Sequence, residues 1–151
     1  MKEEFKTLAD KKFWEKGYTD RKELSAEDVR YPIPGKIYEH FSGHIFKNKN
    51  IFEIGCYPGR FLYHFGRLGF NLNGIDQTDF LEKMMIWFRD NNFSIGEFTK
   101  GDIFDYNTEK KYDLVFSSGF IEHFPNFVEV IKIHTNFVKN GGYIFITAPN
   151  F

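Results

Sequence analysis

An acidic residue and two glycines mark the end of the first short apolar run of the chain. Glu53 lies inside this run, residues 51–56, and Gly55 and Gly59 follow it. Glycines allow a tight turn, and a helix that begins near Gly59 would point its free N–H groups at a ligand. A carboxylate beside such a loop would repel a pyrophosphate and favours a ligand that carries an ammonium or another positive group. The alternative is that Glu53 pairs with a lysine or caps a turn.

Two further acids follow the next two apolar runs. Asp76, with Gln77 beside it, ends the second run, and a carboxylate at that place can accept both hydroxyls of a ribose. Asp102 and Ile103 follow the third run, where the acid could accept the exocyclic amine of an adenine. Taken singly, Asp76 could equally flank a helix, and a Gly-Asp turn after a strand is common.

The fourth apolar run ends in small residues and is followed by a histidine. Ser118 and Gly119 would keep the floor of a crevice open. His123 stands near the end of this predicted strand, so it could contact a substrate or act as a general base. A histidine on a helix surface or at a helix cap is the equal alternative. The neighbouring Glu122 is interpreted as structural.

Alternating strands and helices would position these residues. The apolar runs predict five strands, at residues 51–56, 71–75, 94–99, 112–117 and 142–148. Predicted helices lie between them: residues 59–68 with Gly69 as the stop, one capped by Asp79, and one capped by Asn126 that stops at residues 140–142. Because parallel strands need crossover helices, we predict an α/β fold, a Rossmann-like three-layer sandwich with a mostly parallel sheet. Ligands of such sheets bind beyond the carboxyl ends of the strands.

The first 46 residues have a different pattern. They are polar and helical in character, with breaks predicted at Gly17, Pro32 and Pro34. We therefore predict an N-terminal helical lead-in, residues 1–46, and a Rossmann-like ligand-binding domain, residues 47–151.

The composition is that of one ordinary domain and excludes several functions. The 151 residues carry a net charge of −1, which lacks the basic footprint of proteins that bind nucleic acids or anionic membranes. No apolar stretch approaches the roughly 20 residues that span a bilayer, and the first residues lack an apolar signal segment. A single cysteine, Cys56, rules out a disulfide framework and a four-cysteine zinc site. We predict a cytoplasmic protein with no metal site, no nucleic-acid partner and no membrane partner. The 20 phenylalanines predict a bulky core.

The order of the motifs resembles that of class I S-adenosylmethionine-dependent methyltransferases. The similar segments are Glu53-x-Gly55-x-x-x-Gly59, Asp76, Gly101-Asp102, the run from Tyr112 to Phe124 and the run from Asn140 to Pro149, within residues 50–150. The resemblance implies S-adenosylmethionine as the cofactor. It also implies which residues hold each part: Glu53, Gly55, Cys56, Tyr57 and Gly59 the methionine moiety, Asp76 and Gln77 the ribose, Asp102 and Ile103 the adenine, with Ser118 and Gly119 lining the cavity.

Two features depart from the family pattern. Tyr57 stands where the family has the central glycine of its loop, so its ring either turns away from the cofactor or covers part of its site. Family members continue after the fifth strand with a helix and an antiparallel strand pair, so five of the usual seven strands are expected here. An uncovered fifth strand could pair with another chain, for example in a homo-oligomer.

The lead-in carries a further resemblance. Residues 13–18 are similar to N-terminal segments that fold over the cofactor in some family members. The favoured alternative is that Trp14 packs its helix against the sheet.

The resulting hypothesis is a methyltransferase, or its cofactor-binding portion, that acts on an O, N or C nucleophile of a small molecule. Such a displacement gains chiefly from positioning, so it needs no conspicuous catalytic motif. The candidate bases are His123, His40 and His44. The alternative is a non-catalytic module that binds the cofactor or a partner, which Tyr57 and the missing strands favour. A nicotinamide-dependent oxidoreductase would need a glycine in place of Tyr57.

Overall fold

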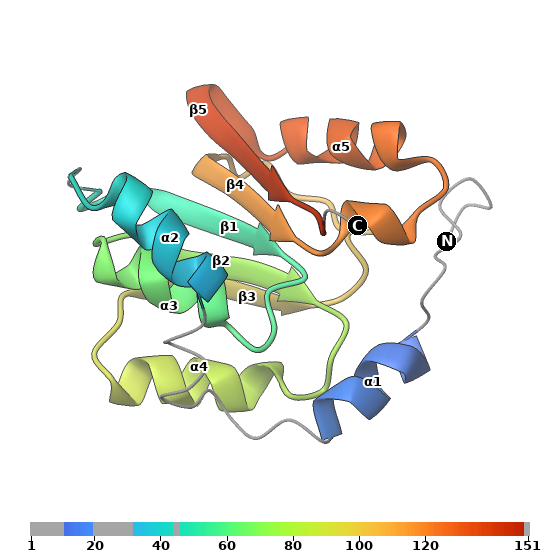
Figure 1. Ribbon diagram of the computed structural model, residues 1–151, viewed down its shortest axis with the longest axis horizontal. Helices are drawn as coiled ribbons and strands as arrows, with labels where there is room; N and C mark the ends of the chain where they lie inside the picture. Colours follow the sequence, from blue (N-terminus) through green and yellow to red (C-terminus); the bar gives the residue numbers. More distant parts are fainter. Residues whose placement is uncertain (1–10, 20–31, 44–45, 150–151) are drawn as a thin grey trace.

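The computed structural model describes residues 11–19, 32–43 and 46–149. Two helices, α1 (Lys11–Thr19) and α2 (Pro32–Phe41), precede the sheet. The elements that follow are β1 (Asn50–Ile54), α3 (Arg60–Arg67), β2 (Asn71–Asp76), α4 (Leu81–Asp90), β3 (Ile95–Lys100), β4 (Tyr112–Ser118), the 3-10 helix η3 (Ile121–His123), α5 (Phe127–Thr135) and β5 (Val138–Thr147). The strand arrows point toward one side of the molecule (Figure 1).

The five strands form one parallel sheet in the order β3-β2-β1-β4-β5. This confirms the predicted α/β fold with a Rossmann-like sheet. The strand order reverses between β1 and β4, and ligands of open parallel sheets bind beyond the carboxyl ends of the strands at that point. β3 and β5 form the edges of the sheet. Pairing of the β5 edge with another chain stays a prediction.

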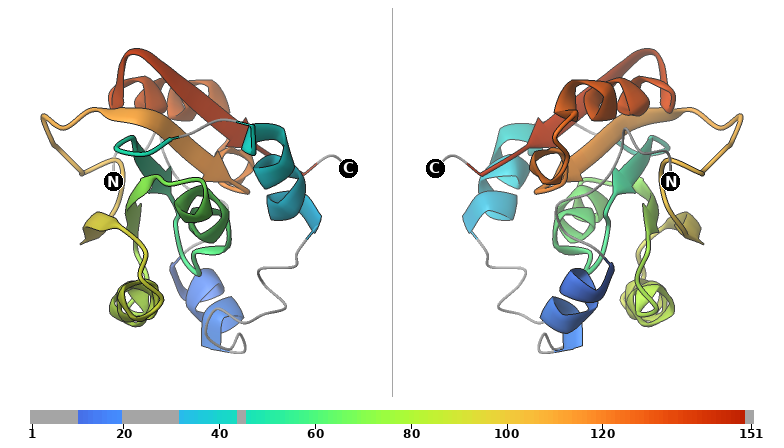
Figure 2. Two further views of the ribbon diagram at one scale, coloured as in Figure 1. Left: turned by 90° about the vertical axis from the view of Figure 1, so that its left-hand side faces the viewer. Right: turned by 90° about the vertical axis from the view of Figure 1, so that its right-hand side faces the viewer.

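Helices cover both faces of the sheet. Along the strands, Ile51 and Phe116 pack into a core cluster with side chains of α2, α3 and α4, whereas Phe52 and Val115 pack into a second cluster. In that second cluster Phe137, which follows α5, is buried. α3 and α5 lie on opposite faces of the sheet (Figure 2). The period of two in the apolar runs therefore produces the three predicted layers.

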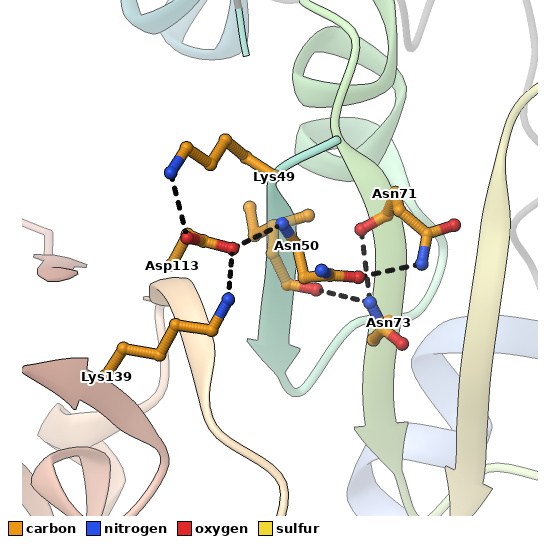
Figure 3. Close-up of polar contacts among 7 residues, drawn as sticks. Lys49, Asn50, Asn71, Asn73, Asp113 and Lys139 are labelled. Atoms are coloured by element: carbon orange, nitrogen blue, oxygen red, sulfur yellow. Dashed lines mark hydrogen bonds and ion pairs between the residues drawn. The ribbon is translucent and has the colours of Figure 1, made fainter. Parts of the chain in front are cut away.

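Polar contacts hold the amino ends of the strands together (Figure 3). Asp113 accepts hydrogen bonds from the Asn50 backbone N–H at 2.9 Å and from Lys139 Nζ at 2.9 Å, and Lys49 Nζ lies 3.3 Å away. The Asn71 amide donates to Asn50 Oδ1 at 2.9 Å. Burial acts to raise the pKa of Asp113, but the Asn50 N–H and the two lysines outweigh it and lower the pKa. The carboxylate, lysine and amide groups of these residues are thus paired with one another.

The predicted cap of α4 is wrong. The helix begins after Phe80 and receives no side-chain cap hydrogen bond. The Phe80 N–H donates to Thr78 Oγ1 at 3.2 Å, and Asp79 forms an ion pair with Lys100. Asn126 does precede α5 as predicted, although its side chain makes no cap hydrogen bond.

The helix stop predicted at residues 140–142 belongs to β5. α5 ends at Thr135, and β5 already begins at Val138. The register between β4 and β5 shifts between Tyr112 and Leu114, and Gly141 has a φ of 76°. The glycines therefore accommodate an irregular strand and do not end a helix.

Within the described residues, the breaks predicted at Gly17 and Pro34 are wrong, whereas α2 does begin at Pro32. α1 continues through Gly17. Pro32 and Pro34 lie in the first turn of α2, where the missing N–H groups would have no partner within the helix. Across the described ranges, no helix has the length and apolarity that a membrane span requires.

Candidate functional site

The loop between β1 and α3, residues 55–59, turns the chain sharply at the switch point of the sheet. Gly55 and Gly59 have φ values of 72° and 91°. The Gly55 N–H donates to the Ile75 carbonyl at 2.9 Å, and a Cβ placed on Gly59 would lie 2.9 Å from Met84 Sδ. The loop is therefore held between β2 and α4, and only glycine fits its last position.

Glu53 brings a buried carboxylate to this loop. The side chain is 3% exposed, and its Oε2 atom has no hydrogen-bond partner within the described part of the chain. Burial raises the pKa of Glu53, the nearby Asp76 charge raises it further, and the Leu62 backbone N–H lowers it. Leu62 lies in the first turn of α3, so Glu53 partly caps this turn, as the alternative interpretation of Glu53 proposed. The second oxygen remains able to accept a donor from a ligand.

Asp76 lies beside Glu53 at the end of β2 and is 9% exposed. Its Oδ2 accepts the Tyr57 N–H at 2.9 Å, and its Oδ1 accepts the Thr78 N–H at 3.0 Å. Burial raises the pKa of Asp76, while these backbone N–H groups act to lower it. Each oxygen keeps a further lone pair that could accept a hydroxyl. Gln77 beside it is exposed.

The side chains of Tyr57 and Cys56, which lie between the two glycines, pack against the core cluster that contains α3 and α4. The Tyr57 ring lies 5.9 Å from the Phe80 ring, at the start of α4. The Cys56 side chain is buried, and a Cβ placed on Gly74 would lie 2.7 Å from its Sγ. Burial raises the pKa of the Cys56 thiol, and the charges of Asp76 and Glu53 raise it further. Cys56 could therefore contact a ligand only through its backbone.

The turn after β3 lies against the end of β2. The Gly101 N–H donates to the Asp76 carbonyl at 2.9 Å. Asp102 Oδ1 accepts the Phe104 N–H at 3.0 Å, and Ile103 is buried in the same cluster as Ile75. The structure thus brings Asp102 and Ile103 to the carboxyl end of the sheet, where Asp76 lies.

The end of β4 lies beside the end of β1, on the other side of the switch point. Ser118 Oγ accepts the Thr147 hydroxyl at 2.8 Å, and Gly119 has a φ of 62°. After it, the Phe120 ring reaches toward the glycine loop, because Phe120 Cδ2 lies 3.6 Å from where a Gly55 Cβ would be.

Glu122 and His123 follow on η3. His123 Nε2 lies 3.9 Å from Glu122 Oε1. Glu122 Oε2 is buried and has no hydrogen-bond partner among the described residues. Glu122 thus presents an unsatisfied acceptor, which differs from the structural role interpreted for it from the sequence.

Trp14 brings α1 into contact with His123, at the carboxyl end of the sheet. The Trp14 ring meets the His123 ring edge-on, with centroids 4.8 Å apart and planes at 89°, and α1 lies on the side toward which the strand arrows point (Figure 1). This contact fits a segment folded over the strand ends better than a helix packed on a face of the sheet.

Of the other candidate bases, His40 is exposed on α2, and His44 lies outside the described residues. In the ranges that the structure covers, no group of three or more His, Cys, Asp or Glu residues could hold a metal ion.

The parallel sheet, its glycine loop and the acids at its strand ends define a Rossmann-like protein, whose ligands are expected at the switch point. Residues 25–151 match the family model described as "Methyltransferase domain", and the chain belongs to this family. This confirms the resemblance that the motifs indicated.

Known proteins of similar sequence and fold carry methyltransferase names. Two relatives are named "Ubiquinone biosynthesis O-methyltransferase". The one from Shewanella pealeana is 28% identical over 122 residues, which cover 79% of this chain and 51% of the relative. The one from Rickettsia akari is 28% identical over 116 residues, which cover 76% and 45%. The chain therefore spans about half the length of these curated relatives. A solved structure, Haemonchus contortus phosphoethanolamine N-methyltransferase 1 with phosphoethanolamine and S-adenosylhomocysteine, has a TM-score of 0.69 at 22% identity and covers 90% of this chain and 30% of that chain.

Proposed function

We propose that this chain binds S-adenosylmethionine at the carboxyl ends of β1 to β4 and serves methyl transfer to a small molecule. The observation that carries the proposal is the buried Glu53 carboxylate, whose Oε2 has no partner within the described residues. An ammonium is the donor that such an oxygen prefers. The sulfonium adds a second positive charge, which the carboxylates of Glu53 and Asp76 would both attract.

The other assigned residues support the same pose. The loop with Gly55 and Gly59 would hold the methionine moiety. Asp76 and Gln77 would hold the ribose hydroxyls, Asp102 and Ile103 the adenine, and Ser118 and Gly119 would line the cavity. All of them lie on the edge of the sheet where open α/β folds bind ligands.

The bound cofactor would supply an electrophilic methyl group. An acceptor with an O, N or C nucleophile would attack it, and the names of the curated relatives favour oxygen. With a hydroxyl acceptor, the transfer would release the hydroxyl proton. His123 is half-buried at the carboxyl end of the sheet, with its Nε2 3.9 Å from Glu122 Oε1, and this pair is the one that we assign to take that proton.

A second candidate function is a module that binds the cofactor or a partner without turnover. Tyr57 favours it, because its bulk replaces a glycine and its N–H is already bonded to Asp76. A turnover assay that follows S-adenosylhomocysteine formation with a panel of small alcohols and amines separates the two. Binding without product formation supports the module.

Calorimetric titration of S-adenosylhomocysteine into the 151-residue chain tests the cofactor assignment. We expect saturable heat and a rise in melting temperature. The Asp76→Ala variant should bind at least about tenfold more weakly, because a charge-assisted contact to the ribose is lost. Asp79→Ala is the matched control, since Asp79 is exposed and pairs with Lys100. The proposal fails if no heat is released, or if the two variants bind equally.

A further inference from the structure

A second carboxylate with an unsatisfied oxygen lies at this edge, outside the residues assigned to the cofactor. Glu122 Oε2 is buried and has no partner within the described residues, while Oε1 lies 3.9 Å from His123 Nε2. An ionised carboxylate oxygen only accepts hydrogen bonds, so a ligand that satisfies it must present a donor. Leaving such an oxygen without a donor is costly, which makes this a place where ligand binding would be favourable.

Aromatic rings lie close to the residues next to this carboxylate. The Trp14 ring packs edge-on against His123, and Phe120 Cδ2 lies 3.6 Å from where a Gly55 Cβ would be. A Cβ placed on Gly119 would lie 3.4 Å from Glu122 Oε1, so the carboxylate sits directly beside the end of β4. An acceptor oxygen and two aromatic rings therefore lie next to the proposed cofactor site.

We propose that Glu122 binds the methyl acceptor: its Oε2 accepts a hydrogen bond from the O–H or N–H of the group to be methylated, and Trp14 and Phe120 flank the acceptor. This assignment rests on the proposed function. Glu122 distinguishes substrate from product, because methylation of a hydroxyl removes the hydrogen that Oε2 binds. It also selects against acceptors that place a carboxylate or phosphate at this point, because two anions would repel each other.

Phenol and anisole are matched probes for this site, since anisole is the methyl ether of phenol and lacks the donor. The chain has two tryptophans, so a Trp87→Phe variant assigns the Trp14 indole N–H signal in a proton–nitrogen NMR spectrum. Both probes are titrated into the full chain, with and without S-adenosylhomocysteine. EDTA is present because a carboxylate and an imidazole could also hold a metal ion.

We expect phenol to shift the Trp14 signal and to bind about tenfold or more tightly than anisole. Glu122→Gln should remove most of this preference by weakening phenol alone, because the charge-assisted hydrogen bond is lost. Glu129→Gln is the matched control, since Glu129 pairs with Lys132 on α5. An unchanged affinity for S-adenosylhomocysteine shows that the Glu122→Gln variant is folded.

The outcomes separate the two proposals. Failure of S-adenosylhomocysteine to bind overturns the cofactor assignment, whereas the phenol titration without it still tests Glu122. The Glu122 assignment is overturned if phenol leaves the Trp14 signal unmoved, if phenol and anisole bind equally, or if Glu122→Gln keeps the preference of the parent chain.

Discussion

Replacing Glu53 by glutamine should stabilise the free protein and weaken its binding of the cofactor. Burial raises the pKa of Glu53, so its ionisation at neutral pH opposes folding. A group with a raised pKa in the folded state contributes stability that is present below its unfolded pKa, about 4.3, and that is lost as the pH rises through the folded value. Glutamine has nearly the same shape, keeps an acceptor for the Leu62 N–H and does not ionise.

The size of the effect follows from the unsatisfied oxygen. A buried polar group that is left without its hydrogen bond costs roughly 1–3 kcal/mol, and a charged group costs more. The NH₂ group of glutamine would also lack a hydrogen-bond partner at this position. We therefore expect a net gain of about 1 kcal/mol in the free energy of unfolding, or about 2–4 °C in melting temperature. The affinity for S-adenosylhomocysteine should fall about tenfold or more, because a charge-assisted hydrogen bond to its ammonium becomes a neutral one.

Two measurements check this reasoning. Urea unfolding between pH 5 and pH 8 should show the stability advantage of Glu53→Gln growing as the pH rises, and calorimetry at neutral pH should show the weaker binding. Glu97→Gln serves as the control, because Glu97 is partly exposed on β3 and pairs with Lys110; its stability should stay within about 0.5 kcal/mol of the parent. A destabilised Glu53→Gln variant, or one that binds S-adenosylhomocysteine as tightly as the parent, would refute this account of the buried carboxylate.

Three further predictions concern the scaffold. Asp113→Asn should lose about 1–3 kcal/mol of unfolding free energy at pH 7; because the pKa of Asp113 is lowered, this difference should shrink as the pH falls from about 3.9 through the folded value, which urea unfolding at acidic pH would show. Gly59→Ala should lower the melting temperature, because a Cβ would lie 2.9 Å from Met84 Sδ at a φ of 91°; overpacking of this kind costs about 1–3 kcal/mol, and an unchanged melting curve would contradict the tight loop. Ser117→Ala should cost about 1–3 kcal/mol in denaturant unfolding, because it leaves the fully buried His134 Nε2 without its partner at 2.9 Å.

The strands could be predicted because their signal is local. Residues such as Ile51 and Phe52 alternate between the two core clusters, and this period of two is visible in the sequence. The start of β5 could not be predicted, because Gly141 is typical of a helix stop and only the pairing with β4 makes this segment a strand. The Asp79 cap failed for a similar reason: Lys100, distant in the chain, binds its carboxylate.

The candidate site also contains residues that could be predicted from the sequence and contacts that could not. Glu53, Asp76 and Asp102 could be named from the sequence because each stands at the end of a strand, and parallel strands bring such ends to one edge. The contact between Trp14 and His123 joins segments that are far apart in the sequence. The unsatisfied oxygen of Glu122 could not be predicted from the sequence either, because it depends on what surrounds the side chain in the fold and not on its neighbours in the chain.

Among the described residues, the carboxylates that keep an unsatisfied buried oxygen lie at the carboxyl end of the sheet, and this indicates where a ligand belongs. At the amino end, Asp113 is bonded to Asn50 and Lys139, and its pKa is lowered (Figure 3). At the carboxyl end, Glu53 and Glu122 each keep a buried oxygen without a partner among the described residues. Since unsatisfied buried acceptors are costly in a folded chain, the carboxyl end has the polar groups that a positively charged cofactor and a hydrogen-bond-donating acceptor would satisfy.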